Sequence, residues 1–322
     1  MRAVYAQSPN PDHPLESLRV GERPDPVVPP GWTTVQVRAA SLNHHDVWTL
    51  RGVGIGAEDF PMILGCDASG IDLATGQEVI VYGVIPSAGW VGDETMDPGR
   101  TILSEKHQGT IAEYVAVPAG NVVPKPAHVS FVDGAAIGVA WLTAYRMLFG
   151  NSGLRPGQTV LVQGATGGVA SACIALARAA GYRVWATART EEKRAFALHV
   201  GAHQAFEPGA RLPERVDAVM ETVGRATWSH SLKALRPGGR VVISGATTGA
   251  LPVAELNRIF FLQLQVIGST MGTKQELTEL VRMVAATGLR PEIDRVMPFE
   301  EAADAIKAME HGELLGKAVF VP

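Results

Sequence analysis

The chain has 322 residues, which is too long for one ordinary core and predicts two domains. Its net charge of -4 includes no run of like charges, so nothing indicates nucleic acid or an anionic membrane surface as a partner. The start of the chain lacks a basic segment before an apolar one, and no apolar run reaches membrane-spanning length. We therefore expect a cytoplasmic protein. Cys66 and Cys173 alone cannot form a disulfide framework or a four-cysteine zinc site.

Residues 1–123 show short strand patterns separated by glycine and proline. Segments 33–40 and 112–118 alternate apolar and polar residues, and 78–83 is a buried apolar run. This half is therefore predicted to be β-rich. Residues 87–110 are polar and rich in turn residues, which indicates either a substrate-facing loop or a plain surface excursion.

After residue 123 the pattern changes to alternating helices and strands. A helix is predicted around 133–148, and further segments follow in strict alternation. Strands are expected at 158–164, 183–187, 216–223 and 240–245, with helices at 167–181, 191–201 and 226–239. This order is typical of a parallel sheet with right-handed crossovers. The tail from about residue 267 has two helical stretches and a closing strand, and its pattern suits either half.

The segment from Gly164 to Ala170 follows a β-branched apolar strand and opens a helix of small residues. Gly164 permits a tight turn, and Gly167 and Gly168 let the backbone approach a pyrophosphate. Exposed N–H groups and the positive helix end would then stabilise phosphate charge. An ordinary strand-to-helix turn is the alternative. The residues predicted to bind the dinucleotide here are Gly164, Ala165, Thr166, Gly167, Gly168 and Val169.

The end of the next strand favours NADPH over NADH. An NAD site would place Asp or Glu there to bind the ribose 2′-hydroxyl, but the chain has Thr187, Ala188 and Arg189. Lys193 follows four residues later, so two cations can converge on a 2′-phosphate. The alternative is a solvated helix start, in which Thr190 is the N-cap and Lys193 pairs with a neighbouring glutamate.

Several motifs, taken in order, resemble those of the medium-chain dehydrogenase/reductases of the quinone oxidoreductase type, over nearly the whole chain. Besides the glycine loop they are SLNHHD (41–46), PMILGCDASG (61–70), GTIAEYVAVPAGNVVPKP (109–126), WLTAY (141–145), LRPGGRVVISG (235–245), IGSTMG (267–272) and LLGKAVFV (314–321). The resemblance implies an α/β protein with a GroES-like, β-rich catalytic domain at 1–123 and 267–322. It further implies a doubly wound Rossmann domain that binds NADPH at 124–266, an active site in the cleft between the domains, and a homodimer.

The resemblance also bears on metal use. Zinc-dependent relatives use a metal to polarise the reacting oxygen. Asn43 stands where those relatives have a cysteine, and Cys66-Asp67 stands where they have a His-Glu pair. Val139 stands where their third ligand is expected. We therefore expect no metal. The alternative is an unconventional site built from some of His44, His45, Cys66, Asp67 and His107.

Four residues of the SLNHHD motif are candidates for catalysis. In zinc-free members the asparagine matching Asn43 lies near the nicotinamide and substrate, and could donate a hydrogen bond to a developing enolate or hydroquinone oxygen. Its alternative role is to cap a loop. His44 or His45 could supply the proton or be hydrogen-bonded within the fold. Asp46 matches an acid of the motif, but a structural role at the start of the helix is favoured.

The resemblance implies further cofactor contacts outside the glycine loop. They are Thr143 near the nicotinamide ribose, Gly224, Gly245 and Ala246 at strand ends, Met271 and Gly272 beside the nicotinamide amide, and Lys317 near phosphate. The carboxyl ends of parallel strands are the usual place for such contacts. Each glycine could alternatively be only a turn residue.

These observations predict an NADPH-dependent reductase that transfers hydride to a quinone or an α,β-unsaturated carbonyl without metal. One alternative is a zinc-type alcohol dehydrogenase with altered ligands. Another is a non-catalytic NADPH-binding sensor, because Trp48 and Gly54 occupy positions that many quinone reductases fill with tyrosine. The sequence does not identify the hydride acceptor, since loops build its pocket.

Overall fold

The computed structural model describes residues 1–322, and the chain divides into two compact units. Unit 1 contains residues 1–139 and 273–322, and unit 2 contains residues 140–272. No helix combines the length and apolar character needed to cross a membrane.

Unit 1 is built mainly from antiparallel strands. Its strands are β1 (Arg2–Ala6), β2 (Leu18–Glu22), β3 (Trp32–Ser41), β4 (Met62–Ile63), β5 (Ala68–Asp72), β6 (Glu78–Val81), β7 (Val84–Ile85), β8 (Thr101–Ile102), β9 (Tyr114–Pro118), β10 (Val122–Pro124), β17 (Ile293–Pro298) and β18 (Lys317–Val321). Its α-helices are α1 (His44–Arg51), α2 (Phe131–Ala135), α8 (Lys274–Thr287) and α9 (Ala302–Glu310). Short 3-10 turns are η1 (Pro14–Ser17), η2 (Ala57–Asp59), η3 (Glu94–Met96), η4 (Ala119–Asn121) and η7 (Phe299–Glu301).

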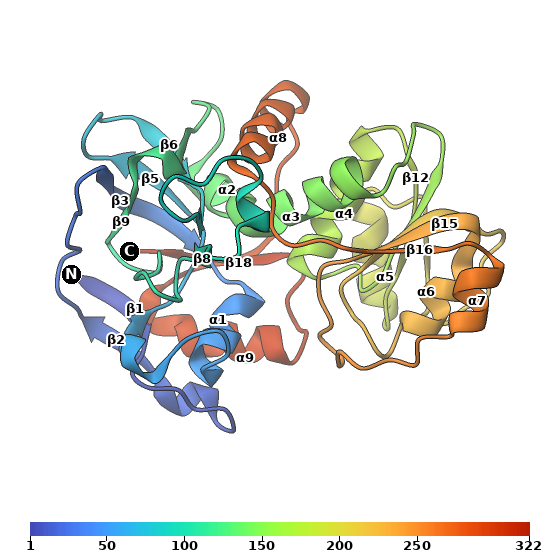
Figure 1. Cartoon of the computed structure of the whole chain (residues 1–322), viewed down its shortest axis with the longest axis horizontal. Coiled ribbons are helices and arrows are strands. Elements are labelled where there is room, and N and C mark those ends of the chain that lie inside the picture. The colour runs from blue at the N-terminus through green and yellow to red at the C-terminus, as the bar shows by residue number, and fades with distance from the viewer. The chain divides into compact units, whose positions relative to one another are not determined.

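The main sheet of unit 1 joins segments that are far apart in the sequence. Its order is β10-β6-β5-β3-β18-β17, and β9 also pairs with β3. Strand β18, red in Figure 1, lies antiparallel to β3, with Phe320 opposite Ala40. Phe320 is fully buried in the core of this unit. The last strand of the chain therefore lies within this sheet, between β3 and β17.

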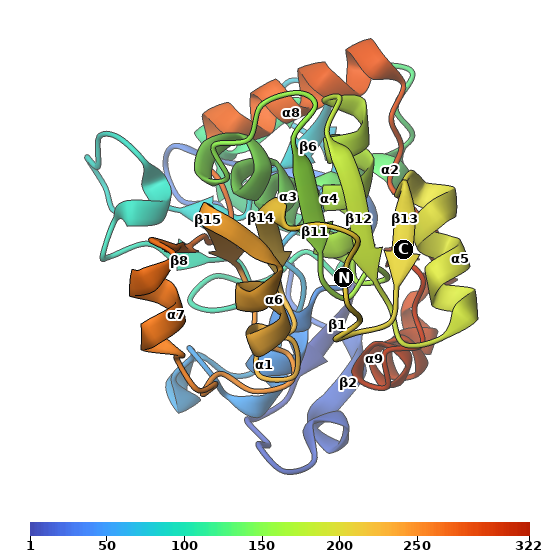
Figure 2. The same ribbon diagram turned by 90° about the vertical axis from the view of Figure 1, so that its right-hand side faces the viewer.

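Unit 2 has the alternation that its sequence predicts. Its strands are β11 (Thr159–Val162), β12 (Arg183–Thr187), β13 (Gln204–Phe206), β14 (Val216–Glu221), β15 (Leu235–Ile243) and β16 (Gln265–Gly268). Its α-helices are α3 (Leu142–Tyr145), α4 (Gly168–Ala179), α5 (Glu191–Val200), α6 (Trp228–Ala234) and α7 (Leu256–Phe261). All strand pairs are parallel, in the order β13-β12-β11-β14-β15-β16, and most of them are seen side by side in Figure 2. This is the doubly wound Rossmann order, and the predicted fold class is confirmed.

The boundary between the two units lies after residue 139, whereas the sequence pattern changes after residue 123. The helix expected around 133–148 begins at Phe131, after Ser130, whose hydroxyl accepts a hydrogen bond from the Asp133 N–H. The chain then stays helical through α3 and two π-helical segments, η5 (Ile137–Trp141) and η6 (Arg146–Asn151).

Helix α2 belongs to unit 1 because it packs on the sheet of that unit. Ser69 on β5 donates a hydrogen bond to the carbonyl of Phe131, and Asp133 pairs with Arg290 at 2.8 Å. Residues 124–139 therefore lie with unit 1 rather than with the predicted domain 124–266. Conversely, Gly268 pairs with Ile243 at the sheet edge, so residues 267–272 lie with unit 2.

Candidate functional site

The turn from Gly164 to Ala170, here called the phosphate loop, has the backbone of an anion site. Gly164 has a φ of +69°, and a Cβ there would lie 2.7 Å from Val223 Cγ2, so the turn requires glycine. Helix α4 begins at Gly168, and its N-cap Gly167 has no side chain to accept a hydrogen bond. The first N–H groups of a helix have no acceptor within the helix. They are therefore available to a phosphate.

Thr187 fixes the phosphate loop through hydrogen bonds to its first residues. Its side chain is buried, and its hydroxyl donates to Gln163 Oε1 and accepts from the N–H of Gly164 at 3.4 Å. The N–H of Ala165 donates to the Thr187 carbonyl at 3.0 Å. These bonds occupy the Thr187 hydroxyl and give Thr187 a supporting role in the loop; its direct contact with the cofactor stays a prediction.

Cationic side chains gather after β12. Arg189 is exposed, and its guanidinium makes no hydrogen bond or ion pair. Thr190 caps α5 by accepting from the N–H of Lys193 at 3.3 Å, so the cap uses the backbone of Lys193 and not its ammonium. Arg194, which the sequence analysis missed, donates to the carbonyls of Ala188 and Arg189 at 3.2 and 3.3 Å. It thereby fixes the path of the segment that carries Arg189.

A buried carboxylate, Glu221, organises the backbone at the end of β14. It accepts hydrogen bonds from the N–H groups of Val223 and Gly224, at 2.8 and 3.0 Å, and from the hydroxyls of Thr227 and Ser231. These four donors compensate the cost of burying the carboxylate. Gly224 has a φ of +87° and packs against Ala246 and Gly249. An acidic residue that ends an apolar strand was the signal available in the sequence.

The other cofactor candidates of unit 2 lie at strand ends or on α3. Thr143 is buried on α3, and Gly245 follows β15, where a Cβ would lie 3.2 Å from the Thr222 carbonyl. Met271 is largely buried and has a left-handed φ of +48°, which costs about 1 kcal/mol or more in a residue other than glycine. Gly272 follows it and ends unit 2.

Unit 1 holds a compact polar group, here called the Asn43 cluster: Ser41, Asn43, Cys66, Asp67 and Lys317. Asn43 precedes α1 and is almost buried. Its Nδ2 donates to Asp67 Oδ1 at 3.0 Å and to the Ser41 carbonyl at 3.3 Å, and it lies 4.0 Å from Cys66 Sγ. Its Oδ1 accepts from Lys317 Nζ at 2.7 Å, and Lys317 also donates to the Leu42 carbonyl.

These bonds place two of the predicted site residues in one network. Both N–H bonds of the Asn43 amide are engaged within the protein, and Asn43 positions Asp67 and Lys317. The Lys317 ammonium is bonded to Leu42 and Asn43 and is 4% exposed, and its contact with phosphate stays a prediction.

Burial controls the charges of the Asn43 cluster. Desolvation raises the pKa of Asp67 to about 6, against the lowering effect of the Lys317 charge. Desolvation also lowers the pKa of Lys317, and nearby Asp67 opposes that shift. The pKa of Cys66 is raised well above its ordinary value, mainly by burial, so its thiol is neutral. Asp67 Oδ2 is buried without a hydrogen-bond partner.

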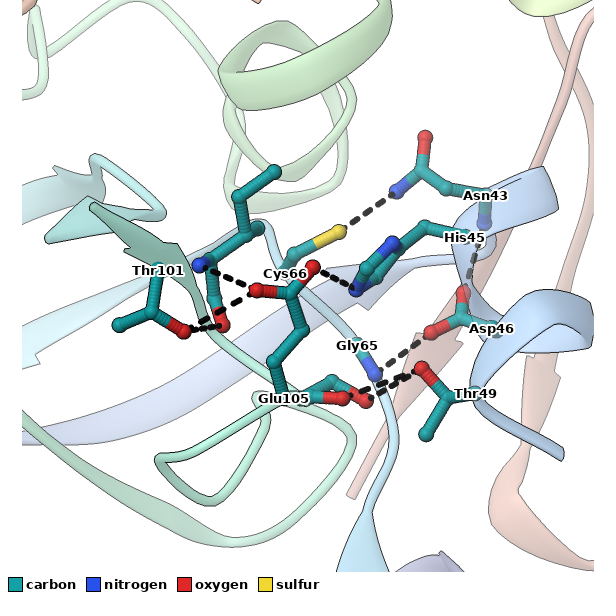
Figure 3. A network of polar contacts seen from close by, with 10 residues as sticks. Asn43, His45, Asp46, Thr49, Gly65, Cys66, Thr101 and Glu105 are labelled. Atoms are coloured by element: carbon teal, nitrogen blue, oxygen red, sulfur yellow. Dashed lines mark hydrogen bonds and ion pairs between the residues drawn. The ribbon is translucent and has the colours of Figure 1, made fainter. Parts of the chain in front are cut away.

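Asp46 stabilises the backbone around α1. Its Oδ2 accepts from the N–H of Asn43 at 2.8 Å, and its Oδ1 accepts from the N–H of Gly65 at 2.7 Å (Figure 3). The residue is completely buried. Both carboxylate oxygens are therefore bonded to the main chain, an arrangement that suits the structural role favoured by the sequence.

The two histidines of the motif differ. His44 is at the surface, and its pKa is lowered by desolvation and then by the charge of Lys317. His45 is partly buried, and its Nε2 lies 3.9 Å from Oε1 of Glu105 (Figure 3). That Nε2 is enclosed and has no hydrogen-bond partner.

The residues present do not fit a zinc site. Nowhere in the chain do three or more His, Cys, Asp or Glu side chains form a group that could hold a metal ion. The Lys317 ammonium is bonded to the Asn43 side chain, and a second cation beside it would be repelled. His107 lies against Trp32, with ring centroids 5.0 Å apart, rather than in the Asn43 cluster.

Comparison with known proteins adds the family. Residues 29–127 match the model of the alcohol dehydrogenase GroES-like domain, and residues 168–286 match that of the zinc-binding dehydrogenases. The quinone oxidoreductase of Lama guanicoe is 29% identical, over 89% of this chain and 88% of that protein. A crotonyl-CoA reductase of Streptomyces avermitilis is 27% identical, over 91% and 79%.

A solved structure shows the same fold over its whole length. It is described as an NAD-dependent alcohol dehydrogenase, is 32% identical, and superposes with a TM-score of 0.92 over 100% of both chains. The motifs, the two folds and these matches agree. The chain therefore belongs to the medium-chain dehydrogenase/reductase superfamily and is an oxidoreductase of the quinone oxidoreductase-like type.

Proposed function

We propose that this protein is an NADPH-dependent reductase that transfers a hydride to a quinone or an α,β-unsaturated carbonyl without a metal ion. The observation that carries the proposal is the phosphate loop, with its uncapped helix end, followed at the next strand end by exposed Arg189 instead of an acid. Two relatives support the acceptor class, since one is named for quinones and the other for a thioester of an unsaturated acid.

Bound NADPH supplies the hydride, and the residues of the chain hold the reactants and stabilise charge. Backbone N–H groups of the phosphate loop bind the pyrophosphate, and Arg189 binds the 2′-phosphate. An acceptor that takes up hydride becomes negatively charged on oxygen. The Lys317 cation, held in place by Asn43, stabilises that negative charge, and the attraction is strong because the buried surroundings have a low dielectric constant.

The direct test is oxidation of NADPH by the purified protein with quinones, enones and enoyl thioesters. We expect turnover with at least one of these classes. If the protein binds NADPH and oxidises it with none of them, the reductase proposal fails and the protein is better described as a cofactor-binding sensor.

Metal independence has a separate test, because one of the matching families is named for zinc. The Asn43 amide already bonds to Asp67 Oδ1 and to the Lys317 ammonium, which supports a metal-free site. We expect less than one tenth of a zinc ion per chain after mild purification, and no loss of activity on dialysis against a chelator. Stoichiometric zinc that activity requires would instead support an alcohol dehydrogenase with altered ligands.

We also propose a homodimer formed through unit 2. Strand β16 ends the parallel sheet with only one strand neighbour, which leaves one backbone edge unpaired. Large apolar side chains are exposed along this part of the chain: Leu251, Val253, Leu256, Phe260, Phe261 and Val266. A second copy would cover both features by a symmetric contact. Sedimentation should give a dimer for the native chain and a monomer for Phe261→Glu; a native monomer would contradict the proposal.

We place the enzyme in the cytoplasm. Its two cysteines are buried and unpaired, which suits a reducing compartment. Fractionation of cells that express the tagged protein would test this location.

A further inference from the structure

Helix α1 and the segment after β8 are tied together beside the Asn43 cluster. His45 and Thr49 are one helical turn apart on α1 and therefore share a face. Thr49 Oγ1 donates to the carbonyl of Ser104 at 3.0 Å (Figure 3). Ser104 is fully buried with a left-handed φ of +71°. Such strain persists only where the surrounding contacts fix it, so Thr49 holds the backbone next to Glu105 in one conformation.

The Glu105 carboxylate is oriented by two further bonds. Its Oε2 accepts from Thr101 Oγ1 at 3.0 Å and from the N–H of Ile102 at 2.9 Å. The remaining oxygen, Oε1, faces His45 Nε2 at 3.9 Å (Figure 3). Both side chains are about one fifth exposed, at 19% and 22%. Oε1 of Glu105 is therefore held in a fixed orientation toward His45 Nε2, which has no hydrogen-bond partner.

The opposite nitrogen of His45 is the accessible one. Nε2 is enclosed, whereas Nδ1 is neither enclosed nor engaged in a hydrogen bond with the protein. A carboxylate behind one ring nitrogen and an open second nitrogen is the arrangement that general acids and bases use. The 3.9 Å separation is longer than a hydrogen bond, and catalytic hydrogen bonds often shorten when substrate binds.

Other nearby groups are less suited to deliver a proton. Asp46 is bonded to two backbone N–H groups, and the thiol of Cys66 is buried with a strongly raised pKa. Lys317 is bonded to Leu42 and Asn43. His44 is at the surface, and the carboxylate whose charge acts on it, Glu310, is paired with Arg51.

We propose that His45 is the catalytic proton donor of the reductase and that Glu105 is its positioning residue. This inference rests on the proposed function. Bound NADPH would supply a hydride from its C4–H bond to the β-carbon of an enone and would leave as NADP⁺. The C=C electrons of the enone would then lie on the carbonyl oxygen as an enolate. The Nδ1–H of protonated His45 then gives its proton to the α-carbon of the enolate, which forms the second new C–H bond and leaves His45 neutral with its remaining proton on Nε2. The saturated carbonyl leaves, and a proton taken up from the medium restores protonated His45.

The first experiment compares kcat for His45→Ala and Glu105→Gln. General acids contribute about 100- to 10,000-fold, so we expect His45→Ala to lose about 100-fold or more in kcat on an enone. Glu105→Gln should lose about 10-fold. Neither variant should change the Kd for NADPH. Added imidazole should restore turnover to His45→Ala in a saturable manner.

Two controls separate proton donation from damage to the fold. The exposed pair His311 and Glu313, 3.7 Å apart, gives matched variants His311→Ala and Glu313→Gln, which should keep the native kcat. N-methylacridinium becomes neutral when it takes a hydride and needs no proton, so His45→Ala should reduce it as fast as the native enzyme does. Unchanged kcat on the enone for His45→Ala, or equal losses on enone and acridinium without imidazole rescue, would overturn the inference.

A measurement without turnover keeps the two proposals distinguishable. In nitrogen-15 spectra, neutral His45 should carry its proton on Nε2, and the resonance of that proton should move in Glu105→Gln. The pairing would be refuted if the proton of neutral His45 lay on Nδ1, or if its resonance were the same in the native protein and in Glu105→Gln. Either result would hold even if the enzyme reduces enones. Absence of any NADPH oxidation in the native protein would instead refute the proposed function.

Discussion

The phosphate loop of unit 2 and the Asn43 cluster of unit 1 are built in opposite ways. The loop is one contiguous turn whose ligand groups belong to the backbone, and its side chains matter mainly by being small. The cluster joins residues as distant in sequence as Asn43, Asp67 and Lys317, and its properties depend on buried charge. The difference teaches that the proposed cofactor site depends on local backbone geometry, whereas the proposed site of chemistry depends on long-range packing.

The largest effect is expected from a substitution that distorts the phosphate loop. Gly164→Val places a side chain at a φ of +69°, in contact with Val223, so we expect NADPH affinity to fall at least about 100-fold. Gly157→Val is the matched control, because Gly157 also has a positive φ, of +86°, but has open space around its Cβ position. Calorimetric titration with NADPH measures both. Equal losses in the two variants would show that strain in the fold, and not the loop, was being measured.

The second prediction concerns buried charge in the cluster. The pKa of Asp67 is about 6 in the folded protein, above its ordinary value of 3.8. The folded state therefore holds this proton more tightly than the unfolded state. Its stabilising contribution is complete at low pH and is lost as the pH rises from about 4 to about 6, by about 3 kcal/mol.

Asp67→Asn should remove this dependence. The free energy of unfolding in urea, compared across pH 4 to 7, should fall more steeply with rising pH for the native protein than for the variant. Asp12→Asn, at an exposed carboxyl without hydrogen bonds, should follow the native curve. Parallel curves for the native protein and Asp67→Asn would mean that the pKa of Asp67 is not raised in the folded protein.

The smallest expected effect sharpens the cofactor assignment. Arg189→Ala removes a charge-assisted contact with the 2′-phosphate, so the Kd for NADPH should rise about 10- to 100-fold while that for NADH changes little. Arg211→Ala, at an exposed arginine of the same unit, should leave both values unchanged. Equal weakening of NADPH and NADH would contradict the role of Arg189.

The comparison also explains what the sequence could predict. Strand and helix alternation around β11 and α4 is local, and it predicted the parallel sheet and the glycine turn. The motif at residues 41–46 drew attention to Asn43, but not to its bonds with Asp67 and Lys317, because these depend on tertiary packing. Glu105 was missed for the same reason. It lies 60 residues from His45, and tertiary contacts such as that between Thr49 and Ser104 bring its segment to α1.

The central claim is that this protein moves a hydride from NADPH to an electron-poor carbon, and isotope transfer tests it most directly. NADPH carrying deuterium at C4 on the transferred face should give a reduced enone with one deuterium at its β-carbon, and turnover should slow by a primary isotope effect. A product without deuterium, formed while NADPH is oxidised, would contradict the claim.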